Sequence, residues 1–375
     1  MKIGILTLPL HNNYGGILQA YALQTIIERM GHEVVVIDEP IKLKHATVKT
    51  LVKRIIKKCV GKPTTFFWER YIYDTYSVVN KDIQRFINTY LHRIVVENPS
   101  LLNEMDFDAI VVGSDQIWRP KYYPQIENPY LDFASNWKNL MRIAYAPSFG
   151  TDECEYSDKQ TEKITKLIYK FSAISVREGT GIKLCEEHFG IKPQLVLDPT
   201  MLLSCYDYNK LIDSTKTLPP DGSLLNYVLD ISESIQKLIS FISKDLRMRP
   251  FSVNGPTFIE GCKAEDCIKP SIETWLRGFR DAEFIITDSF HACVFSLIYN
   301  KPFCVIGNKK RGMTRFRNLL ELFNQEFRLI VGVDEFKIKK ENLKEKPNVK
   351  FEESEFKQRS FDFLNILKSD KDSEL

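Results

Sequence analysis

The sequence has no uninterrupted hydrophobic run long enough to cross a membrane and no strong excess of charge. Its longest apolar stretch, Phe284 to Ile306, contains charged residues and a histidine, so we expect no membrane span. The opening residues predict a short strand, and no signal-peptide cleavage pattern follows them. A formal net charge of +3 does not indicate nucleic acid as a partner. We therefore expect a cytoplasmic protein.

Nucleotide and metal motifs are also lacking. The sequence has neither a GxGxxG fingerprint nor a Walker loop, so nucleotide binding is weakly indicated. Of the eight cysteines, only Cys262 and Cys267 are close in sequence, and no second pair or histidines complete a zinc site. The acidic residues are too dispersed to suggest a metal site. We expect reduced thiols, no metal and no cofactor.

At 375 residues the chain is longer than one ordinary hydrophobic core and fits two domains. Lys2 to Asp38 has the order strand, glycine-bearing loop, helix and strand, which is typical of a βαβ unit. A second alternation begins at Leu224, after a polar stretch from Ser204 to Gly222 that predicts a linker. The predicted fold class is α/β, with two Rossmann-like domains facing across a cleft. We place these domains at residues 1–203 and 204–350, a helical insertion at about 41–100, and a C-terminal helix at 351–375 that packs back on the first domain.

One segment fits neither sheet. Residues 41–62 contain eight lysines and arginines and no acidic residue. From Val48 to Lys62 the apolar residues fall on one helical face and the cations fall largely elsewhere. Such a helix can lie on the inner face of the cytoplasmic membrane or near a diphosphate headgroup. The alternative is a helix that covers the sheet with a solvated basic face, and it is favoured because further helix from Phe66 to Leu91 needs something to pack on.

A single histidine lies where an apolar strand changes into a helix. The strand runs to Thr287, and helical periodicity follows through Val294 and Ile298. Turn residues of this kind lie at the carboxyl end of a sheet, where free N–H groups and the helix dipole favour an anion. His291 can there exchange a proton near neutral pH beside a bound phosphate or carboxylate. The alternative is a half-buried histidine that caps the helix and packs on Phe290.

The loop after the first strand is a candidate ligand contact. Asn12, Asn13, Tyr14, Gly15 and Gly16 lie between a strand and a helix, so their backbone N–H groups point to the mouth of the cleft. Two glycines allow a ligand to approach closely. A tight turn with asparagine caps explains the same residues equally well.

A second loop, Gly113 to Trp118, groups an acid, an amide and an indole at one strand end. Asp115 and Gln116 can form hydrogen bonds to sugar hydroxyls, and Trp118 can stack on a pyranose ring. Asp115 can also accept a proton from an attacking hydroxyl. The alternative is a helix N-cap with no further role.

Cations follow two other strands. Arg177 comes directly after a strand, and its guanidinium suits bidentate capture of a carboxylate or phosphate, although an ion pair with Glu178 or another neighbour is the alternative. The basic loop after Ile306 contains Arg311 and Arg315, and at least one of its cations should point at the cleft.

Taken together, these segments resemble the polysaccharide pyruvyl transferase family over nearly the whole chain. The resemblance rests on five segments in order: Asn13-Tyr-Gly-Gly-Ile-Leu-Gln-Ala20, Gly113-Ser-Asp-Gln-Ile-Trp118, Ser175-Val-Arg-Glu178, Asp198-Pro199 and Asp288-Ser-Phe-His-Ala292. It implies a fold similar to GT-B glycosyltransferases, with a C-terminal helix that crosses back. It also implies transfer of an enolpyruvyl-derived group from phosphoenolpyruvate onto two hydroxyls of one sugar, which forms a cyclic ketal. Acceptors in the family are cell-wall or capsular glycans, often as lipid-linked intermediates.

The resemblance assigns His291 as the catalytic histidine and Arg177 as an arginine that holds the donor. Many members carry an arginine two residues before the histidine, where this chain has Ser289. We expect Arg311 or Arg315 to supply that charge, with Ser289 and Phe290 beside the donor. His291 would protonate the methylene carbon and Asp115 would accept the hydroxyl proton, without a metal. The implied partners are phosphoenolpyruvate and a sugar such as galactose, linked to undecaprenyl diphosphate.

Two other functions remain open. One is a nucleotide-sugar glycosyltransferase of the same architecture, although no clear acidic pair for a ribose is visible in the second half. The other is a non-catalytic protein that binds glycans or lipid diphosphates, which the serine at position 289 keeps open. In the pyruvyl transferase hypothesis, replacing His291 with alanine abolishes turnover, whereas replacing Arg177 with alanine mainly weakens donor binding.

Overall fold

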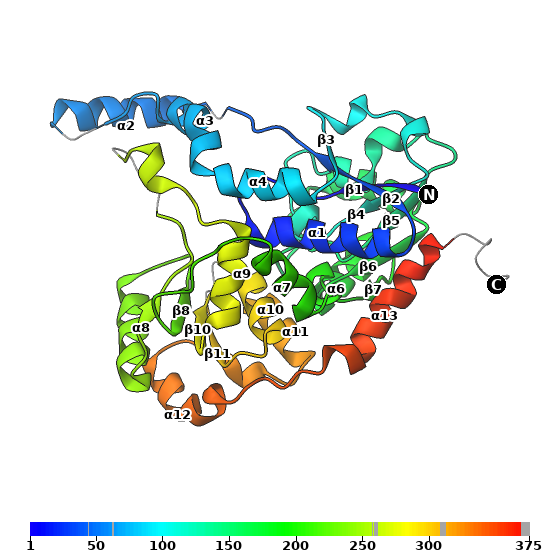
Figure 1. Ribbon diagram of the computed structural model, residues 1–375. Helices are drawn as coiled ribbons and strands as arrows, with labels where there is room; N and C mark the ends of the chain where they lie inside the picture. Colours follow the sequence, from blue (N-terminus) through cyan, green and yellow to red (C-terminus); the bar gives the residue numbers. More distant parts are fainter. Residues whose placement is uncertain (44, 62–63, 257, 259–261, 308–312, 369–375) are drawn as a thin grey trace.

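The computed structural model describes residues 1–43, 45–61, 64–256, 258, 262–307 and 313–368. These residues form two β-sheets with helices around them, and the C-terminal helix returns to the first sheet (Figure 1). Every strand pair in both sheets is parallel. Parallel strands place their carboxyl ends at one edge of a sheet, and the loops there commonly form binding sites.

The first sheet has seven strands in the order β3-β2-β1-β4-β5-β6-β7. The strands are β1 (Lys2–Leu6), β2 (Glu33–Asp38), β3 (Arg93–Val95), β4 (Ala109–Val112), β5 (Met141–Ala144), β6 (Ala173–Val176) and β7 (Gln194–Leu195). All four residues of β4 are buried, as expected for a strand inside a parallel sheet that is covered on both faces. The helices of this half are α1 (Tyr14–Arg29), α2 (Val48–Cys59), α3 (Trp68–Val79), α4 (Lys81–Tyr90), α5 (Asp158–Ile168) and α6 (Gly179–Phe189).

The second sheet has five strands in the order β12-β11-β10-β8-β9. These are β8 (Leu224–Tyr227), β9 (Pro250–Phe251), β10 (Phe284–Thr287), β11 (Phe303–Ile306) and β12 (Leu329–Ile330). The helices of this half are α7 (Cys205–Asp213), α8 (Glu233–Leu246), α9 (Ile272–Asp281), α10 (Phe290–Ile298), α11 (Met313–Glu321) and α12 (Val333–Lys344). Helix α10 is buried along its whole length, so its first turn is held firmly against the other half.

The C-terminal helix α13 (Glu355–Leu364) confirms the predicted return to the first half. The Ser360 hydroxyl oxygen accepts a hydrogen bond from the Leu197 backbone N–H at 2.9 Å. The Phe363 ring packs on Tyr145, with the ring centroids 5.9 Å apart. Helix α13 therefore anchors the end of the chain beside β7 and fastens the second half to the first (Figure 1).

Two predictions about connecting segments are wrong. The predicted linker from Ser204 to Gly222 contains helix α7, which begins with a capping box between Ser204 and Asp207. Tyr208 of this helix is fully buried against Phe295 of α10, so the segment is part of the core. The predicted insertion at 41–100 also contains β3, which extends the first sheet beside β2. The division at residue 203 stays a prediction.

Helix α2 contradicts the favoured packing interpretation, because it buries none of its residues and does not cover the sheet. The sequence-based interpretation assumed that the helices after residue 66 pack on this segment, whereas α3 and α4 pack on other parts of the protein. Among the described residues, no helix combines the length and apolar character that spanning a bilayer requires.

Candidate functional site

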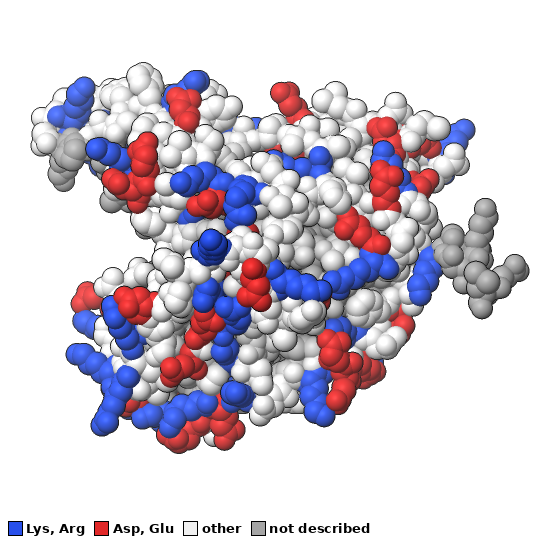
Figure 2. Space-filling model, in the orientation of Figure 1, with Lys and Arg blue, Asp and Glu red and all other residues white. Residues whose placement is uncertain are grey.

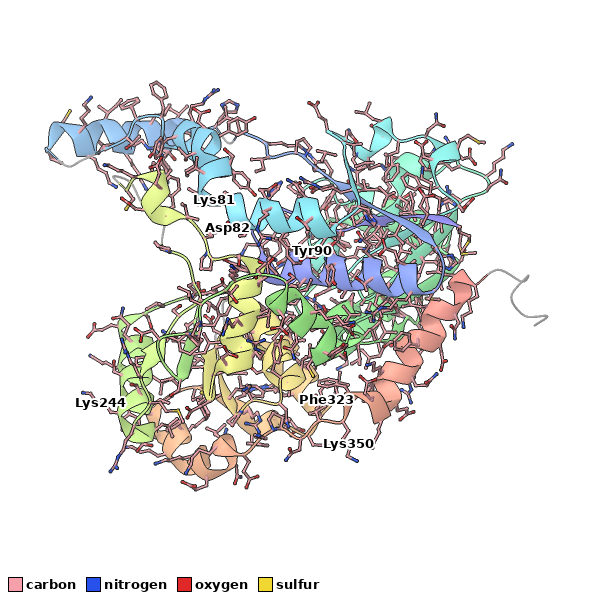
Figure 3. All side chains as sticks on the ribbon, viewed as in Figure 1. Lys81, Asp82, Tyr90, Lys244, Phe323 and Lys350 are labelled. Carbon is pink, nitrogen blue, oxygen red and sulfur yellow. The ribbon has the colours of Figure 1, made fainter. Side chains whose placement is uncertain are left out.

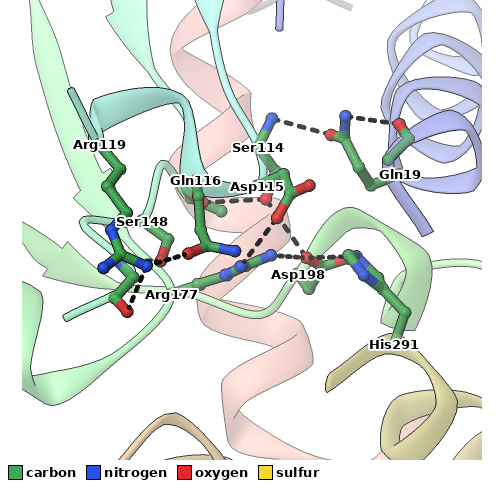
Figure 4. Close-up of polar contacts among 12 residues, drawn as sticks. Gln19, Ser114, Asp115, Gln116, Arg119, Ser148, Arg177, Asp198 and His291 are labelled. Atoms are coloured by element: carbon green, nitrogen blue, oxygen red, sulfur yellow. Dashed lines mark hydrogen bonds and ion pairs between the residues drawn. The ribbon is translucent and has the colours of Figure 1, made fainter. Parts of the chain in front are cut away.

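Loops from both halves meet at the carboxyl edge of the first sheet. Asp115 follows β4, Arg177 follows β6 and Asp198 follows β7, while His291 lies in the first turn of α10 in the other half. Figure 4 shows these four side chains facing one another. The sequence-based expectation that His291 and Arg177 face the same region therefore agrees with the geometry.

Arg177 is enclosed by three carboxylates. Its Nη1 donates to Asp198 at 2.8 Å, its Nη2 to Asp115 at 3.2 Å and its Nε to Glu178 at 3.3 Å. The guanidinium also lies over the Phe290 ring, 4.4 Å from its centroid. Burial by itself lowers the pKa of Arg177, but the three carboxylates outweigh burial and hold that pKa above its ordinary value. Only 1% of the Arg177 side chain is exposed, so Arg177 holds the carboxylates in place from the interior of the protein.

Because these bonds occupy all three guanidinium nitrogens, the structure supports the alternative that Arg177 forms ion pairs with its neighbours. The three bonds use three of the five N–H groups of the guanidinium, so the predicted role of Arg177 in donor binding stays a prediction. The contacts themselves indicate that Arg177 positions the carboxylates.

His291 reaches across the junction between the halves. Its Nε2 lies 3.7 Å from Asp198 Oδ2, which is too long for a strong hydrogen bond but close enough for charge attraction. The imidazole also lies against the backbone of Gly15, where a Cβ atom would overlap the ring. Its side chain is 9% exposed, and its Nε2 atom is buried.

Asp198 connects the histidine to the arginine. Its Oδ1 accepts the Thr200 hydroxyl at 2.7 Å, and its Oδ2 accepts both Arg177 and the Ser114 hydroxyl. Burial by itself raises the pKa of this carboxyl, but His291 and Arg177 outweigh burial and hold that pKa well below its usual range. Asp198 is therefore a fixed anion beside the imidazole.

Gly15 supplies a direct test of this junction. Replacing Gly15 with alanine is expected to lower activity at least about tenfold, because the new methyl group displaces the imidazole and proton transfer depends on close positioning. Replacing Gly332 with alanine is the matched control, since its Cβ would meet no described atom within 4 Å. Steady-state rates of the two variants, with circular dichroism spectra, make the comparison. Equal activity in both variants would contradict the contact.

The predicted acceptor loop divides into two parts. Asn12 and Asn13 are exposed, and the Asn13 amide donates to Asp115 Oδ2 at 3.2 Å. Tyr14 instead belongs to the junction, where its ring stacks on Trp275 at 5.7 Å and its hydroxyl donates to the Pro270 carbonyl at 2.7 Å. The prediction that Tyr14 contacts an acceptor is therefore wrong.

The predicted sugar-stacking indole is also wrong. Trp118 is fully buried and stacks on Tyr130 with the ring centroids 4.9 Å apart. Gln116 of the same loop is held by Arg119, whose Nη1 donates to the amide oxygen at 3.2 Å (Figure 4). Tyr122 is 47% exposed and lies under the Arg119 guanidinium, so it is the aromatic ring of this region that a sugar can reach.

A groove opens next to the cluster and shares Asn13 with it. Its volume is ≈ 560 Å³, and Asn12, Lys42, Lys121 and Tyr122 also line it. Glu39 lines the groove as well and pairs with Lys42 at 2.7 Å, so Lys121 is the lysine of the groove that suits a negatively charged ligand, and the amides and the exposed tyrosine suit hydroxyls. The groove begins at Asn13, which bonds to Asp115.

The expected donor contacts of the second half are partly located. Arg315 of α11 is buried, with 8% of the residue exposed. Burial first and Arg177 second lower its pKa, and the carboxylates of Glu178 and Asp115 act in the opposite direction. Neighbouring Thr314 donates to Asp152 of the first half. Ser289 is the N-cap of α10, and Phe290 lies under Arg177. Arg311 lies outside the described residues.

Two residues with a clear place in the site received no role from the sequence. Asp198 was noticed only as the end of a strand, although an aspartate before Pro199 with Thr200 two residues on is a turn signature. Gln19 donates to the Gly16 carbonyl at 2.8 Å and accepts the Ser114 N–H at 2.8 Å, so it ties the Gly15 loop to the Asp115 loop (Figure 4). Its position in the first turns of α1 carried no signal for this role.

Charge within the cluster is nearly balanced. Three carboxylates face the guanidinium groups of Arg177 and Arg315, and a protonated His291 would complete the balance. Within the described part of the chain, no group of three or more His, Cys, Asp or Glu side chains is arranged to hold a metal ion. Fixed cations and a helix N-terminus beside His291, a residue that can transfer a proton, suit chemistry on an anionic substrate.

Comparisons with known proteins agree with this geometry. The sequence profile described as "Polysaccharide pyruvyl transferase" matches residues 13–310. No curated protein sequence matches the chain. The UDP-GlcNAc 2-epimerase of Methanocaldococcus jannaschii, in complex with UDP-GlcNAc and UDP, has a TM-score of 0.50 at 15% identity, covering 98% of this chain and 100% of that one. The UDP-GlcNAc 2-epimerase of Neisseria meningitidis, bound to UDP-GlcNAc, has a TM-score of 0.51 at 10% identity, covering 97% and 99%.

At such low identity these two likenesses concern the fold alone. They confirm the predicted fold class, in which two Rossmann-like units face each other as in GT-B proteins.

Proposed function

Because the chain belongs to the polysaccharide pyruvyl transferase family, we propose that it forms a cyclic pyruvate ketal on a sugar of a surface-polysaccharide precursor. The donor in this proposal is phosphoenolpyruvate. The acceptor is a sugar such as galactose, linked to a lipid diphosphate. The observation that carries the proposal is the contact of His291 with Gly15 and Asp198, which brings a proton-transfer group of one half to the fixed charges of the other.

His291 is the acid in this scheme. As an imidazolium it gives a proton to the methylene carbon of the donor, which becomes a methyl group, while the fixed anion Asp198 stabilises the protonated ring. An oxygen of the sugar then bonds to the central carbon, and its proton goes to Asp115 through Oδ2, the oxygen that faces Asn13. The bond from that carbon to the phosphate oxygen breaks, and phosphate leaves with the electron pair. The second hydroxyl oxygen bonds to the same carbon and closes the ring. Its proton goes to His291, which restores the acid, while the proton on Asp115 leaves with the phosphate.

The donor anion needs fixed positive charge. We assign the anion to Arg315, which lies beside the cluster in the second half, and to the N-terminus of α10 at Ser289. The position of Arg315 beside Arg177 supports this assignment. Arg177 then acts through Asp198 and Asp115, whose carboxyl groups it holds in place.

The groove beside Asp115 suits the acceptor. Asn12 and Asn13 offer amides to sugar hydroxyls, Tyr122 offers an exposed ring, and Lys121 offers charge to a diphosphate. Because Asn13 contacts both the groove and Asp115, a sugar in the groove has its hydroxyls close to the proposed base.

Incubation with phosphoenolpyruvate and a lipid-linked, galactose-containing acceptor tests the proposal. We expect phosphate release, together with an acceptor mass increase that corresponds to a ketal. Consumption of a nucleotide sugar instead would indicate the glycosyltransferase alternative. Glycan binding without turnover of either donor would indicate a binding protein.

A further inference from the structure

Helix α2 exposes a row of apolar side chains at one edge of the molecule. In Figure 1 it projects beyond both sheets, next to α3. Val48, Val52, Ile55 and Ile56 are 79%, 48%, 49% and 58% exposed, and none of the residues of the helix is buried. Spacings of four, three and one residues put these four side chains on one face.

Lysines surround this apolar row. Lys49, Lys53, Lys57 and Lys58 are all exposed, and no acidic residue occurs between positions 41 and 62. In Figure 2 the end of the molecule that α2 forms carries blue side chains around uncharged surface. At 100° per residue, Lys49 borders the apolar row, Lys53 and Lys58 lie farther round on its two sides, and Lys57 lies behind it.

The helix is nevertheless held in a defined direction. Arg54, on the side away from the apolar row, forms a two-pronged ion pair with Glu69 of α3 at 2.7 and 2.9 Å and donates to the Phe66 carbonyl at 3.0 Å. The Thr47 hydroxyl caps the first turn by accepting the Thr50 N–H. Arg54 is thus the cation of this helix that serves the fold, and the four lysines are left for another surface.

We propose that α2 docks the protein on an anionic lipid bilayer, lying flat with its apolar row in the headgroup region. Insertion removes the exposed valines and isoleucines from water, and the flanking lysines pair with lipid phosphates. A nucleic acid would satisfy the lysines but leave the apolar row in water. Packing against the same face of a second copy would bury the row but bring lysines of both copies together, without an acid in this segment to neutralise them.

The position of α2 also relates to the groove. Ile41 and Lys42 line the groove, and the chain then runs to α2 at Val48. If the proposed function holds, docking through α2 presents the groove to an acceptor whose lipid tail stays in the same bilayer. Docking itself needs neither donor nor acceptor, so it can be tested without them.

Vesicle sedimentation in about 0.15 M salt tests the proposal. Wild-type protein is expected to bind vesicles of phosphatidylglycerol and phosphatidylcholine, and to bind pure phosphatidylcholine weakly. The variant with Lys49→Gln, Lys53→Gln, Lys57→Gln and Lys58→Gln should lose at least about tenfold in affinity, because each lysine near an anionic surface contributes to binding.

A matched control removes the same number of charges elsewhere. Lys159, Lys183, Lys244 and Lys346 are exposed, and Lys244 on α8 lies well away from α2 (Figure 3). Replacing these four with glutamine should leave vesicle binding within about twofold of wild type, because lysines far from the surface are screened.

A second variant tests the apolar row itself. The variant with Val52→Ser, Ile55→Ser and Ile56→Ser should bind vesicles more weakly than wild type, at low salt as well, because the loss of apolar burial does not depend on salt. Its circular dichroism spectrum should be unchanged. No binding by wild type, or equal binding by the two lysine variants, would overturn the proposal. A wild-type dimer that these serines convert to a monomer would also overturn it, in favour of a second copy as the occupant.

Discussion

Replacing His291 with alanine is expected to abolish turnover without unfolding the protein. A positioned acid contributes about 10²- to 10⁴-fold to a rate, and His291 is the proposed proton-transfer group at this junction. Removing it leaves the fixed charges of Arg177, Asp115 and Asp198 in place, since these bond to one another independently of the ring. Phosphate release from phosphoenolpyruvate measures the loss, and thermal unfolding measures the fold.

His188→Ala is the control for this experiment. His188 is exposed on α6 and takes no part in the cluster, so its loss should change neither the rate nor the melting temperature. Full activity in His291→Ala would rule out the assignment of the acid. A melting temperature that falls together with activity would show that the residue serves the fold.

Replacing Arg177 with alanine is expected to destabilise the protein strongly, in contrast to the sequence-based prediction of weaker donor binding alone. The guanidinium is the shared partner of three buried carboxylates, and its side chain is 1% exposed. Removing one partner of a buried ion pair costs about 3–5 kcal/mol, because the remaining charges stay buried without compensation. For a chain of this size that corresponds to a melting temperature lower by about 5 °C.

The loss of stability in Arg177→Ala is expected to depend on pH. In wild type the pKa of Asp198 is depressed, so its stabilisation is present above the ordinary aspartate value of about 3.9 and is lost as pH falls through the depressed value. In the variant, burial still raises the pKa of Asp198, while the Arg177 charge that lowers that pKa is lost. Protonation then favours the folded variant, and stability lost at neutral pH should return as pH falls toward 5. The gap in melting temperature between variant and wild type should therefore be larger at pH 7.5 than at pH 5.

Two further variants separate charge from geometry. Arg177→Lys keeps the charge but forms fewer of the bonds, so it should recover part of the stability. Arg70→Ala removes an exposed arginine that pairs with Asp74 at 2.8 Å, and solvent-exposed pairs of this kind contribute little to stability. If Arg177→Ala and Arg70→Ala lowered the melting temperature equally, the buried cluster would have no special role in stability.

The convergence of the site was predictable because it follows from local order along the chain. Asp115 and Arg177 each come directly after an apolar strand, and strand ends of a parallel sheet meet at one edge. His291 follows a strand of the other half and begins a helix, which predicted its place at the junction. The ion pairs and hydrogen bonds of each side chain were not predictable in the same way, since partners such as Asp198 lie far away in sequence.

The wrong predictions concern residues that are buried in the folded protein. Trp118 and Tyr14 have the composition of sugar contacts, but a sequence does not state which side of a loop faces the core. The predicted linker from Ser204 to Gly222 contains polar residues because one face of α7 is exposed. The other face of α7 is buried through Tyr208 and its neighbours.

The sequence alone determined the two parallel α/β units, the order of the strand-end loops and the family resemblance, because apolar periodicity and turn chemistry act over short stretches. The tertiary structure decided which charges are neutralised and which surfaces stay open. Arg177 is enclosed by Asp115, Glu178 and Asp198, whereas α2 stands clear of the sheet. Both outcomes depend on contacts between distant segments, and the free energy of a charge or an apolar side chain is set by what surrounds it.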